Sequence, residues 1–507
     1  MTNAPKSKIA KIATAVNLGF DGKLITIEAH ITKGLPAFNI VGLAAKSVGE
    51  SRERVRAAIV NSGFDFPAKH ITINLAPADV AKNGSHFDLP IAIAILVASG
   101  QLLAKSAEKI IFAGELSLSG ELRSIRGALG FAEIAKNNKF NELILPEVNS
   151  MQAALIPEVS VVGFTSLSQI ALHLLGENVV NPTLKIDVKN MCSAMENVVD
   201  LDIIDEIRGQ ESAKRALVIA AAGHHNILFS GTPGSGKTML AKSLPGLLPP
   251  LSISEMLETT KIHSLIDEND DIITTRPFRS PHSTSSTAAI AGGGINTKPG
   301  EISLAHNGVL FFDEIPEFSR NALELLRQPL EDHKISVSRA NIKTTYPANF
   351  MLIATMNPCP CGYLSDPDRE CTCSQQQISN YQAKISGPLL DRIDLRLKVA
   401  KVSHKKMFAN EKPTPQAKIF REKIARARGH QMTRQGKPNS SLSNKELDIF
   451  AKLDEKSRNL LNSATEKLKL SARSHFKIIR IARTIADLEG QKDIRQSDIA
   501  EALQFRG

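Results

Sequence analysis

A glycine-rich stretch constrains this chain more than any other feature. It reads G-T-P-G-S-G-K-T from Gly231 to Thr238 and fits G-x-x-x-x-G-K-[ST], in which backbone N–H groups point at phosphate oxygens. An apolar run at 226–230 precedes it, and a helix-forming run at 239–244 follows it. A bare glycine-rich turn is the alternative, but strand, loop and helix start are the context that the motif requires. The sequence therefore predicts a phosphate-binding loop on a parallel α/β sheet.

Each residue of this loop has an expected part in binding ATP and Mg²⁺. Lys237 can reach the terminal phosphates, and the hydroxyl of Thr238 can ligate the metal ion. The remaining positions form the loop that is expected to cradle the phosphates, with a backbone N–H group at each position except the proline: Gly231, Thr232, Pro233, Gly234, Ser235 and Gly236.

Two later apolar strands end in polar residues suited to hydrolysis. The run 308–312 ends at Asp313, which can hold Mg²⁺, and at Glu314, which can polarise an attacking water. Solvated acids after a strand are the alternative for this pair. The run 350–356 ends at Asn357, whose neutral amide can bind a water or the γ-phosphate.

An arginine follows in Leu389-Leu-Asp-Arg392. At the edge of a subunit, Arg392 can neutralise transition-state charge on a neighbour's nucleotide. An ordinary surface ion pair is the alternative, and Arg392 alone would favour it.

Taken in order, these motifs resemble the AAA+ ATPases. The segments 276–282, 292–294 and 299–314 resemble the magnesium-chelatase-like clade, and within it the ComM/YifB group, from about residue 10 to the C-terminus. The resemblance implies an AAA+ P-loop parallel sheet with a helical lid, preceded by a mixed α/β Lon-protease-like domain of the ribosomal S5 domain 2 type. It also implies a hexameric ring, ATP-driven movement on DNA and branch migration during natural transformation.

Composition and resemblance together divide the chain into segments. We expect a Lon-protease-like domain at 1–175, a linker at 176–200, the ATPase core at 201–400, a basic linker and helix at 401–440, and the lid at 441–507. The longest apolar stretch, 89–98, is about half of the roughly 20 residues that a membrane span needs. With no secretory signal in 1–11, we expect a cytoplasmic protein without a membrane partner.

Local patterns in the Lon-like domain predict a hairpin at 19–22, a buried helix at 90–99 and a strand at 109–118. They also predict a helix at 128–137 and a last strand at 142–146.

The Lon-like domain raises protease activity as an alternative function. Lon-type chemistry needs a serine nucleophile beside a lysine base. Ser85 lies near the expected serine, but His86 and Phe87 replace small residues, and the segment 126–131 contains no lysine. We therefore expect a protease fold without protease chemistry, acting in partner binding or ring assembly.

The resemblance also implies that the lid offers an arginine to the phosphates. Arg473 and Arg480 are the two candidates, and comparison with different branches of the superfamily selects different ones. Arg473 is preferred as the catalytic arginine, with Arg480 as a nucleotide-binding one. A DNA or surface contact is the alternative for each.

Four cysteines form C-x-C-x₉-C-x-C: Cys359, Cys361, Cys371 and Cys373. Four thiolates can complete a tetrahedral zinc site, and the bound ion would stabilise the loop 359–373. Because the usual spacing is C-x₂-C, reduced surface thiols or a redox pair remain alternatives.

The net charge of +10 is unevenly distributed. Residues 401–507 contain 24 Lys and Arg against 12 Asp and Glu, so this part carries the whole excess. A basic surface favours nucleic acid, with a solvated helical surface as the alternative. We expect single-stranded or branched DNA to bind without sequence preference, in part at an insert around 283–298. A metal-insertion ATPase of the magnesium chelatase type is the rival function. The excess of basic residues in the lid argues against this rival.

Overall fold

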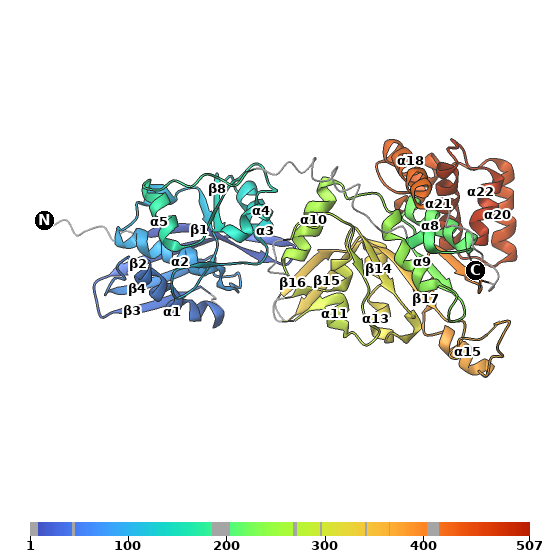
Figure 1. The fold of residues 1–507 in the computed structure, drawn as a ribbon, viewed down its shortest axis with the longest axis horizontal. Helices are drawn as coiled ribbons and strands as arrows, with labels where there is room; N and C mark the ends of the chain where they lie inside the picture. Colours follow the sequence, from blue (N-terminus) through green and yellow to red (C-terminus); the bar gives the residue numbers. More distant parts are fainter. Residues whose placement is uncertain are drawn as a thin grey trace.

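The structure is a computed structural model that describes residues 9–42, 46–184, 203–266, 271–294, 297–339, 342–364, 366–402 and 415–506. Three parts follow one another along its long axis (Figure 1). An N-terminal α/β domain is followed by a second α/β domain and then by a cluster of helices. The predicted linker at 176–200 and the predicted basic segment at 401–440 lie partly outside the described residues, and the predicted domain boundaries stay predictions.

The N-terminal domain is built on a mixed seven-stranded sheet with the order β3-β4-β2-β1-β5-β8-β9. The predicted hairpin at 19–22 is confirmed, because Leu18 pairs with Asp21 across it. The strands are β1 (Ala10–Leu18), β2 (Asp21–Thr32), β3 (Ala37–Val41), β4 (His70–Ala76), β5 (Ile110–Phe112), β8 (Glu142–Pro146) and β9 (Ser160–Phe164).

Helices pack on both sides of this sheet. The buried α2 is apolar over nearly its whole length, in agreement with the sequence, and α5 begins at the cap Ser166, whose side chain accepts a hydrogen bond from the backbone of Gln169. The helices are α1 (Lys46–Asn61), α2 (Asp88–Ser99), α3 (Ala128–Asn137), α4 (Glu147–Ala153) and α5 (Leu167–Leu175).

Two expectations for this domain were wrong. The apolar run 109–118 forms two short strands, β5 and β6 (Glu115–Leu116), instead of one. Gly114 interrupts it, because its backbone bonds to His86 and Leu89 at the start of α2. The strand at 142–146 is not the last, since β9 pairs with it in parallel. The short β7 (Leu122–Arg123) pairs with β6.

The second domain contains a five-stranded sheet with the order β11-β14-β17-β10-β18, and every pair in it is parallel. The strands β14 and β17 are buried throughout, as expected for a sheet covered on both faces. The strands are β10 (Ile227–Ser230), β11 (Phe278–Arg279), β14 (Val309–Phe312), β17 (Met351–Met356) and β18 (Leu395–Lys398). With the lid, this sheet confirms the predicted fold class.

The lid shares one apolar core with the first helices of the second domain. Helix α21 packs against both α18 and α8, and Figure 1 shows α20 and α22 at the end farthest from the N-terminal domain. The helices concerned are α8 (Glu211–Gly223), α9 (Lys237–Ser243), α18 (Ala417–Gln435), α19 (Asn444–Phe450), α20 (Glu455–Lys467), α21 (Ala472–Leu488) and α22 (Gln496–Gln504).

Two hairpins extend the second domain. The predicted insert around 283–298 folds into α11 (Thr287–Ala291), β12 (Gly292–Gly293) and the start of β13 (Lys298–Pro299), with residues 295–296 outside the described part. The second hairpin joins β15 (Lys334–Arg339) to β16 (Ile342–Pro347). The two meet where the hydroxyl of Tyr346 donates to the carbonyl of Thr297 at 2.6 Å.

Helix α10 (Ile253–Ser264) connects the two α/β domains (Figure 1). Met256 on this helix is buried in a cluster formed mainly by the N-terminal domain. Lys261 pairs with Glu133 and places its ammonium 4.2 Å from the centre of the Phe20 ring. Among the described residues, no helix is long and apolar enough to cross a membrane.

Candidate nucleotide-binding site

The phosphate loop joins β10 to α9, as the sequence predicts. Gly234 and Gly236 have φ of 75° and 87°, left-handed values that favour glycine. Gly231 is required for another reason, because a Cβ there would lie 2.3 Å from the carbonyl oxygen of Val399. The loop therefore has a tight backbone path that leads into the N-terminus of a helix, an arrangement suited to phosphate.

Lys237 is bent back over the loop. Its ammonium donates to the carbonyls of Gly231 at 2.7 Å and Thr232 at 2.9 Å, and to Oδ1 of Asn357 at 3.3 Å. Burial lowers the pKa of Lys237, while the charges of Asp313 and Glu314 oppose that shift. The ammonium therefore lies between the loop and the ends of β14 and β17.

Thr238 faces Asp313, with the hydroxyl 3.3 and 3.4 Å from the two carboxylate oxygens. A hydroxyl and a carboxylate at this spacing are oxygen donors of the kind that Mg²⁺ prefers. Glu314 follows with a left-handed φ of 50°, and its Oε1 accepts a bond of 3.4 Å from the amide of Asn357. The structure thus brings together five predicted side chains: Lys237, Thr238, Asp313, Glu314 and Asn357.

Thr355 is a functional residue that the sequence analysis missed. It is fully buried in β17, and its hydroxyl donates to Oδ1 of Asp313 at 2.5 Å and accepts from the backbone N–H of Glu314 at 2.9 Å. It stands two residues before Asn357, so both side chains leave the strand on the same face. That alternation was the signal available in the sequence.

Gln210 was also missed. Its side-chain amide donates to the carbonyl of Ser235 at 3.1 Å and to that of Ala400 at 2.6 Å. It thereby ties the entry of the second domain to the phosphate loop. Because its partners are backbone atoms far away in the chain, no local sequence pattern indicates the contact.

Arg392 and Arg473 lie together on another surface. Glu331 accepts from both, and the bond from Nη2 of Arg473 measures 3.4 Å. All three line a cavity of about 390 Å³, and none of the described residues lining it belongs to the phosphate loop. The structure therefore separates these arginines from the Lys237 of their own chain.

Arg480 lines the same cavity but bonds within the lid. It donates to the carbonyl of Leu442 at 2.7 Å and to the side chain of Asn444 at 3.1 Å. Burial lowers its pKa. Through these bonds Arg480 holds α21 against the start of α19, and its predicted role in nucleotide binding stays a prediction.

The four cysteines of the loop 359–373 gather into one cluster, and their sulfur atoms all lie within 4.8 Å of one another. The Sγ atoms of Cys359, Cys361 and Cys371 are 3.4 to 3.6 Å apart. Tetrahedral zinc, with Zn–S bonds of about 2.3 Å, sets sulfurs about 3.8 Å apart, so the donor set fits this metal.

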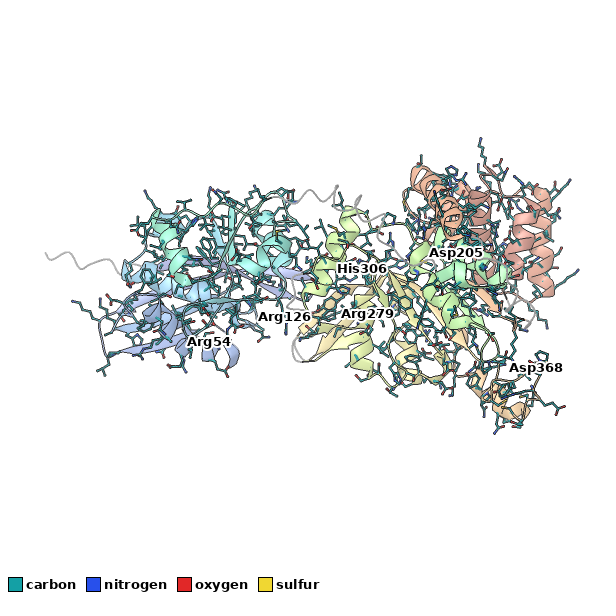
Figure 2. All side chains as sticks on the ribbon, viewed as in Figure 1. Arg54, Arg126, Asp205, Arg279, His306 and Asp368 are labelled. Carbon is teal, nitrogen blue, oxygen red and sulfur yellow. The ribbon has the colours of Figure 1, made fainter. Side chains whose placement is uncertain are left out.

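The cysteine loop touches the phosphate loop. A Cβ on Gly362 would lie 2.8 Å from Cγ of Pro233, so only glycine allows this approach. Lys401 anchors the other side of the loop by bonding to Asp366 at 2.8 Å and to Asp368 at 3.3 Å. Figure 2 shows Asp368 at the edge of the molecule, far from the N-terminal domain.

The parallel sheet, the phosphate loop and the acid pair after β14 define a P-loop ATPase of the AAA+ class. Three domains of one family match the chain: magnesium chelatase subunit ChlI at residues 203–407, subunit ChlI of Mg-chelatase at 27–149, and the ChlI C-terminal domain at 415–506.

Similar proteins extend over almost the whole chain. Competence protein ComM of Haemophilus influenzae is 43% identical over 500 residues, which cover 98% of this chain and 97% of that protein. The uncharacterized protein YifB of Escherichia coli is 41% identical over 498 residues, 98% of this chain and 96% of its own length. The chain therefore belongs to the ComM/YifB group of magnesium-chelatase-like AAA+ ATPases. A magnesium-chelatase 67 kDa subunit of Chlorobaculum parvum is 26% identical over 163 residues, 30% of this chain and 23% of that subunit.

Proposed function

We propose that this protein is an ATP-driven motor that forms a hexameric ring on DNA and promotes branch migration in natural transformation. The observation that carries the proposal is the division of the hydrolytic groups between two surfaces. One surface holds Lys237, Thr238, Asp313 and Glu314, and the other holds Arg392 and Arg473. A ring places the second surface of one subunit against the first surface of the next.

Magnesium-bound ATP supplies the phosphoryl group and the energy. The phosphate loop binds the phosphates through its N–H groups, and Lys237 turns from the loop carbonyls toward the terminal phosphate. Thr238 and Asp313 hold the metal ion. Glu314, oriented by Asn357, polarises the attacking water and accepts its proton.

The arginines complete the site from the neighbouring subunit. Arg392 exchanges Glu331 for the terminal phosphate of the adjoining subunit and neutralises the charge that develops there. Arg473 shares Glu331 in the described structure and serves the same nucleotide. Because each site needs two subunits, hydrolysis depends on assembly.

DNA is the proposed partner because the positive excess lies in residues 401–507 and because one relative is named a competence protein. The two hairpins, β12–β13 and β15–β16, extend from the ATPase domain and would contact the DNA. Contacts by Lys and Arg to phosphates make binding independent of sequence and strongly dependent on salt.

We propose that zinc occupies the cysteine cluster. Four thiolates would fill the coordination of the ion, so its role would be structural.

A metal-insertion ATPase remains the rival function, favoured by the partial likeness to a magnesium-chelatase subunit. Protease chemistry is disfavoured, because the Ser85 hydroxyl donates to Glu115 and the segment 126–131 has no lysine.

Binding to linear, forked and four-way DNA, measured with nucleotide at several salt concentrations, tests the proposal. We expect affinity to fall steeply with salt and to be highest for branched DNA. ATP hydrolysis should rise when that DNA is added. Affinity that does not change with salt, or hydrolysis of casein, would contradict it.

A further inference from the structure

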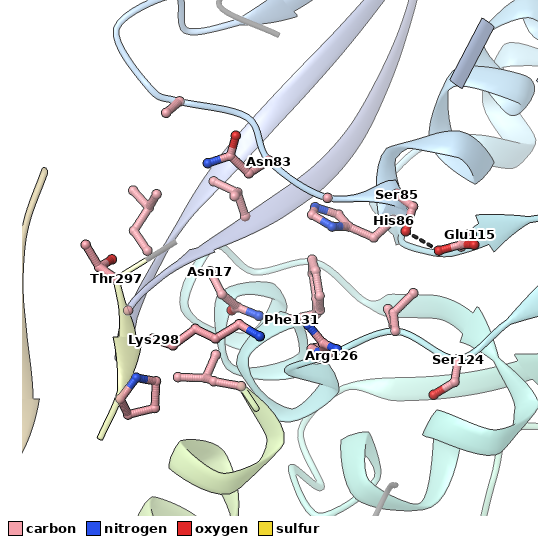
Figure 3. A pocket seen from close by; sticks show the side chains of 18 of the residues that line it. Asn17, Asn83, Ser85, His86, Glu115, Ser124, Arg126, Phe131, Thr297 and Lys298 are labelled. Carbon is pink, nitrogen blue, oxygen red and sulfur yellow. Dashed lines mark hydrogen bonds between the residues drawn. The ribbon is translucent and has the colours of Figure 1, made fainter. Parts of the chain in front are cut away.

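The structure has cavities at two of the junctions between its parts. One, of about 480 Å³, lies between the N-terminal domain and the hairpins of the ATPase domain, where Glu115 accepts from the hydroxyl of Ser85 (Figure 3). The other, of about 390 Å³, lies between the ATPase core and the lid and is lined by both Arg392 and Arg473. In this second cavity, an ion pair joins the two segments of the chain that carry these arginines.

The ion pair is formed by Lys477 of α21 and by Asp394, which directly precedes β18. The ammonium of Lys477 lies 2.7 Å from Oδ1 of Asp394, and the two side chains are only 14% and 11% exposed. Burial by itself raises the pKa of Asp394, but the charge of Lys477 and the bond to His225 hold that pKa well below its usual range. Asp394 is therefore an ionised carboxylate in the folded chain, and removing its cation would leave a buried charge without its partner.

Each member of the pair lies close to one of the arginines in the sequence. Arg473 and Lys477 are four residues apart on α21, so they lie on one face of that helix. Arg392 and Asp394 are two residues apart, between α16 (Gly387–Leu390) and β18. All four side chains line the same cavity. The ion pair therefore fixes the lid to the core within one helical turn of each arginine.

Asn226 connects this arrangement to the parallel sheet. Its backbone N–H donates to Oδ2 of Asp394 at 3.0 Å, and its side-chain amide donates to the carbonyl of Arg392 at 3.3 Å. Its amide oxygen accepts from the backbone N–H of Leu352 in β17 at 2.8 Å. Because β17 ends directly before Asn357, one side chain joins the segment of Arg392 to the strand that leads to Asn357.

His225 forms a second connection between Asp394 and the lid. Its Nδ1 lies 3.6 Å from Oδ2 of Asp394, and its Nε2 lies 2.9 Å from the hydroxyl of Thr484 on α21. Thr484 follows Lys477 by about two helical turns. Helix α21 is thus held to Asp394 at two points along its length.

We propose that Lys477 and Asp394 are positioning residues that set the distance between Arg392 and Arg473, so that both arginines reach one nucleotide of the neighbouring subunit. The inference rests on the proposed function, in which these arginines serve that nucleotide. Without the ion pair, the lid segment would shift against the core segment, and a shift of about 1 Å can cost on the order of a hundredfold in rate. No described residue that lines the cavity belongs to the phosphate loop, so nucleotide binding by that loop should change little.

Replacing Lys477 with Met removes the charge and keeps the length of the side chain. We expect kcat for ATP hydrolysis to fall by about ten- to a hundredfold with a smaller change in KM, and Lys477→Arg to retain most of the activity. Asp394→Asn should have the same effect, and the double variant should lose no more than either single one, because both remove one interaction. The control is Lys467→Met, an exposed lysine of the lid outside the cavity, which should hydrolyse ATP as the wild type does.

Mixed rings distinguish a positioning role from a general loss of structure. In rings of Lys477→Met and Lys237→Ala subunits, some interfaces combine an intact phosphate loop with correctly placed arginines, so up to about a quarter of the wild-type activity should return. Rings of Lys477→Met and Arg392→Ala subunits should keep the low activity of the single variants, because both are defective on the same surface.

Rings of Arg392→Ala and Lys237→Ala subunits are the reference for this experiment. Recovery in the reference without recovery for Lys477→Met, or a wild-type kcat in Lys477→Met, would overturn this inference alone. Absence of recovery in the reference would overturn the shared site of the proposed function, and this inference with it.

Discussion

At the scale of single residues, the proposed hydrolytic site contains a threonine that bonds to both acids. Thr355 bonds to Asp313 and to the backbone of Glu314 and so fixes the two acids relative to each other. Misplacement of a catalytic group by about 1 Å can cost on the order of a hundredfold in rate.

Replacing Thr355 with Val keeps the shape of the side chain and removes both bonds. We expect kcat for ATP hydrolysis to fall by about ten- to a hundredfold, with a smaller change in KM. Thr465→Val is the control, because that hydroxyl bonds only within the lid. Wild-type kcat in Thr355→Val would show that the two acids need no such support.

The ring of His86 makes stability depend on pH. Its Nε2 lies 3.1 Å from the carbonyl of Ala15, and burial lowers its pKa to about 4. The unfolded chain, with a histidine pKa of about 6.5, therefore binds a proton between these pH values that the folded chain does not. Stability should be highest above pH 6.5 and fall by up to about 3 kcal/mol toward pH 4.

Urea unfolding of wild type and His86→Gln across this range measures the effect. The variant should lose part of the pH dependence, while the other histidines continue to contribute theirs. Identical slopes in the two proteins would mean that His86 titrates normally in the fold.

The sequence predicted the side chains that the structure brings together beside the phosphate loop, but not the residues that hold those side chains in place. Lys237, Asp313 and Asn357 each follow a strand or loop pattern that can be read locally. Thr355, Gln210 and the partners of Arg392 could not be found in this way, because their contacts join segments far apart in the chain. The roles proposed for the arginines stay predictions.

At the scale of elements, the cysteine loop is the piece most directly joined to the phosphate loop. Gly362 packs against Pro233, and Gln382 of α15 (Gln375–Gln382) donates to the carbonyl of Pro358 at 3.0 Å. A metal ion bound by the four cysteines would stabilise both the cysteine loop and the end of β17, which Asn357 follows.

We expect protein purified under reducing conditions to contain one zinc ion per chain, and Cys371→Ser to lose it. Because the loop supports Pro233, the loss should also reduce ATP hydrolysis. Metal analysis by atomic emission measures the first effect, and the control is Cys192→Ser, because this fifth cysteine of the chain is not part of the C-x-C-x₉-C-x-C motif. A metal-free wild type that hydrolyses ATP normally would support reduced thiols instead.

Element boundaries show what local patterns miss. The sequence predicts α2 and α3 within two residues at each end, and α2 was predicted from its continuous apolar run. The strand predicted at 109–118 was wrong, because pairing of Gly114 with the start of α2 interrupts it. The β-strand β9 was missed altogether.

At the scale of the whole molecule, the account requires that neighbouring subunits share each active site. Arg392 and Arg473 lie apart from the phosphate loop of their own chain and share Glu331. In the proposed ring, head-to-tail contacts would bring them to the next subunit.

Mixing two inactive variants tests this arrangement. Lys237→Ala lacks its own phosphate-loop lysine, and Arg392→Ala lacks the arginine given to the neighbour. In mixed rings, some interfaces combine an intact loop with an intact arginine, so up to about a quarter of the wild-type activity should return. No recovery in demonstrably mixed rings would place Arg392 outside the neighbouring site.

ATP-dependent strand exchange on a four-way DNA junction tests the central claim most directly. The account predicts that the wild-type protein exchanges strands only while it hydrolyses ATP, that the junction stimulates hydrolysis, and that Lys237→Ala does neither. A folded, assembled wild-type protein that hydrolyses ATP at the same rate with and without the junction, and exchanges no strands, would contradict it.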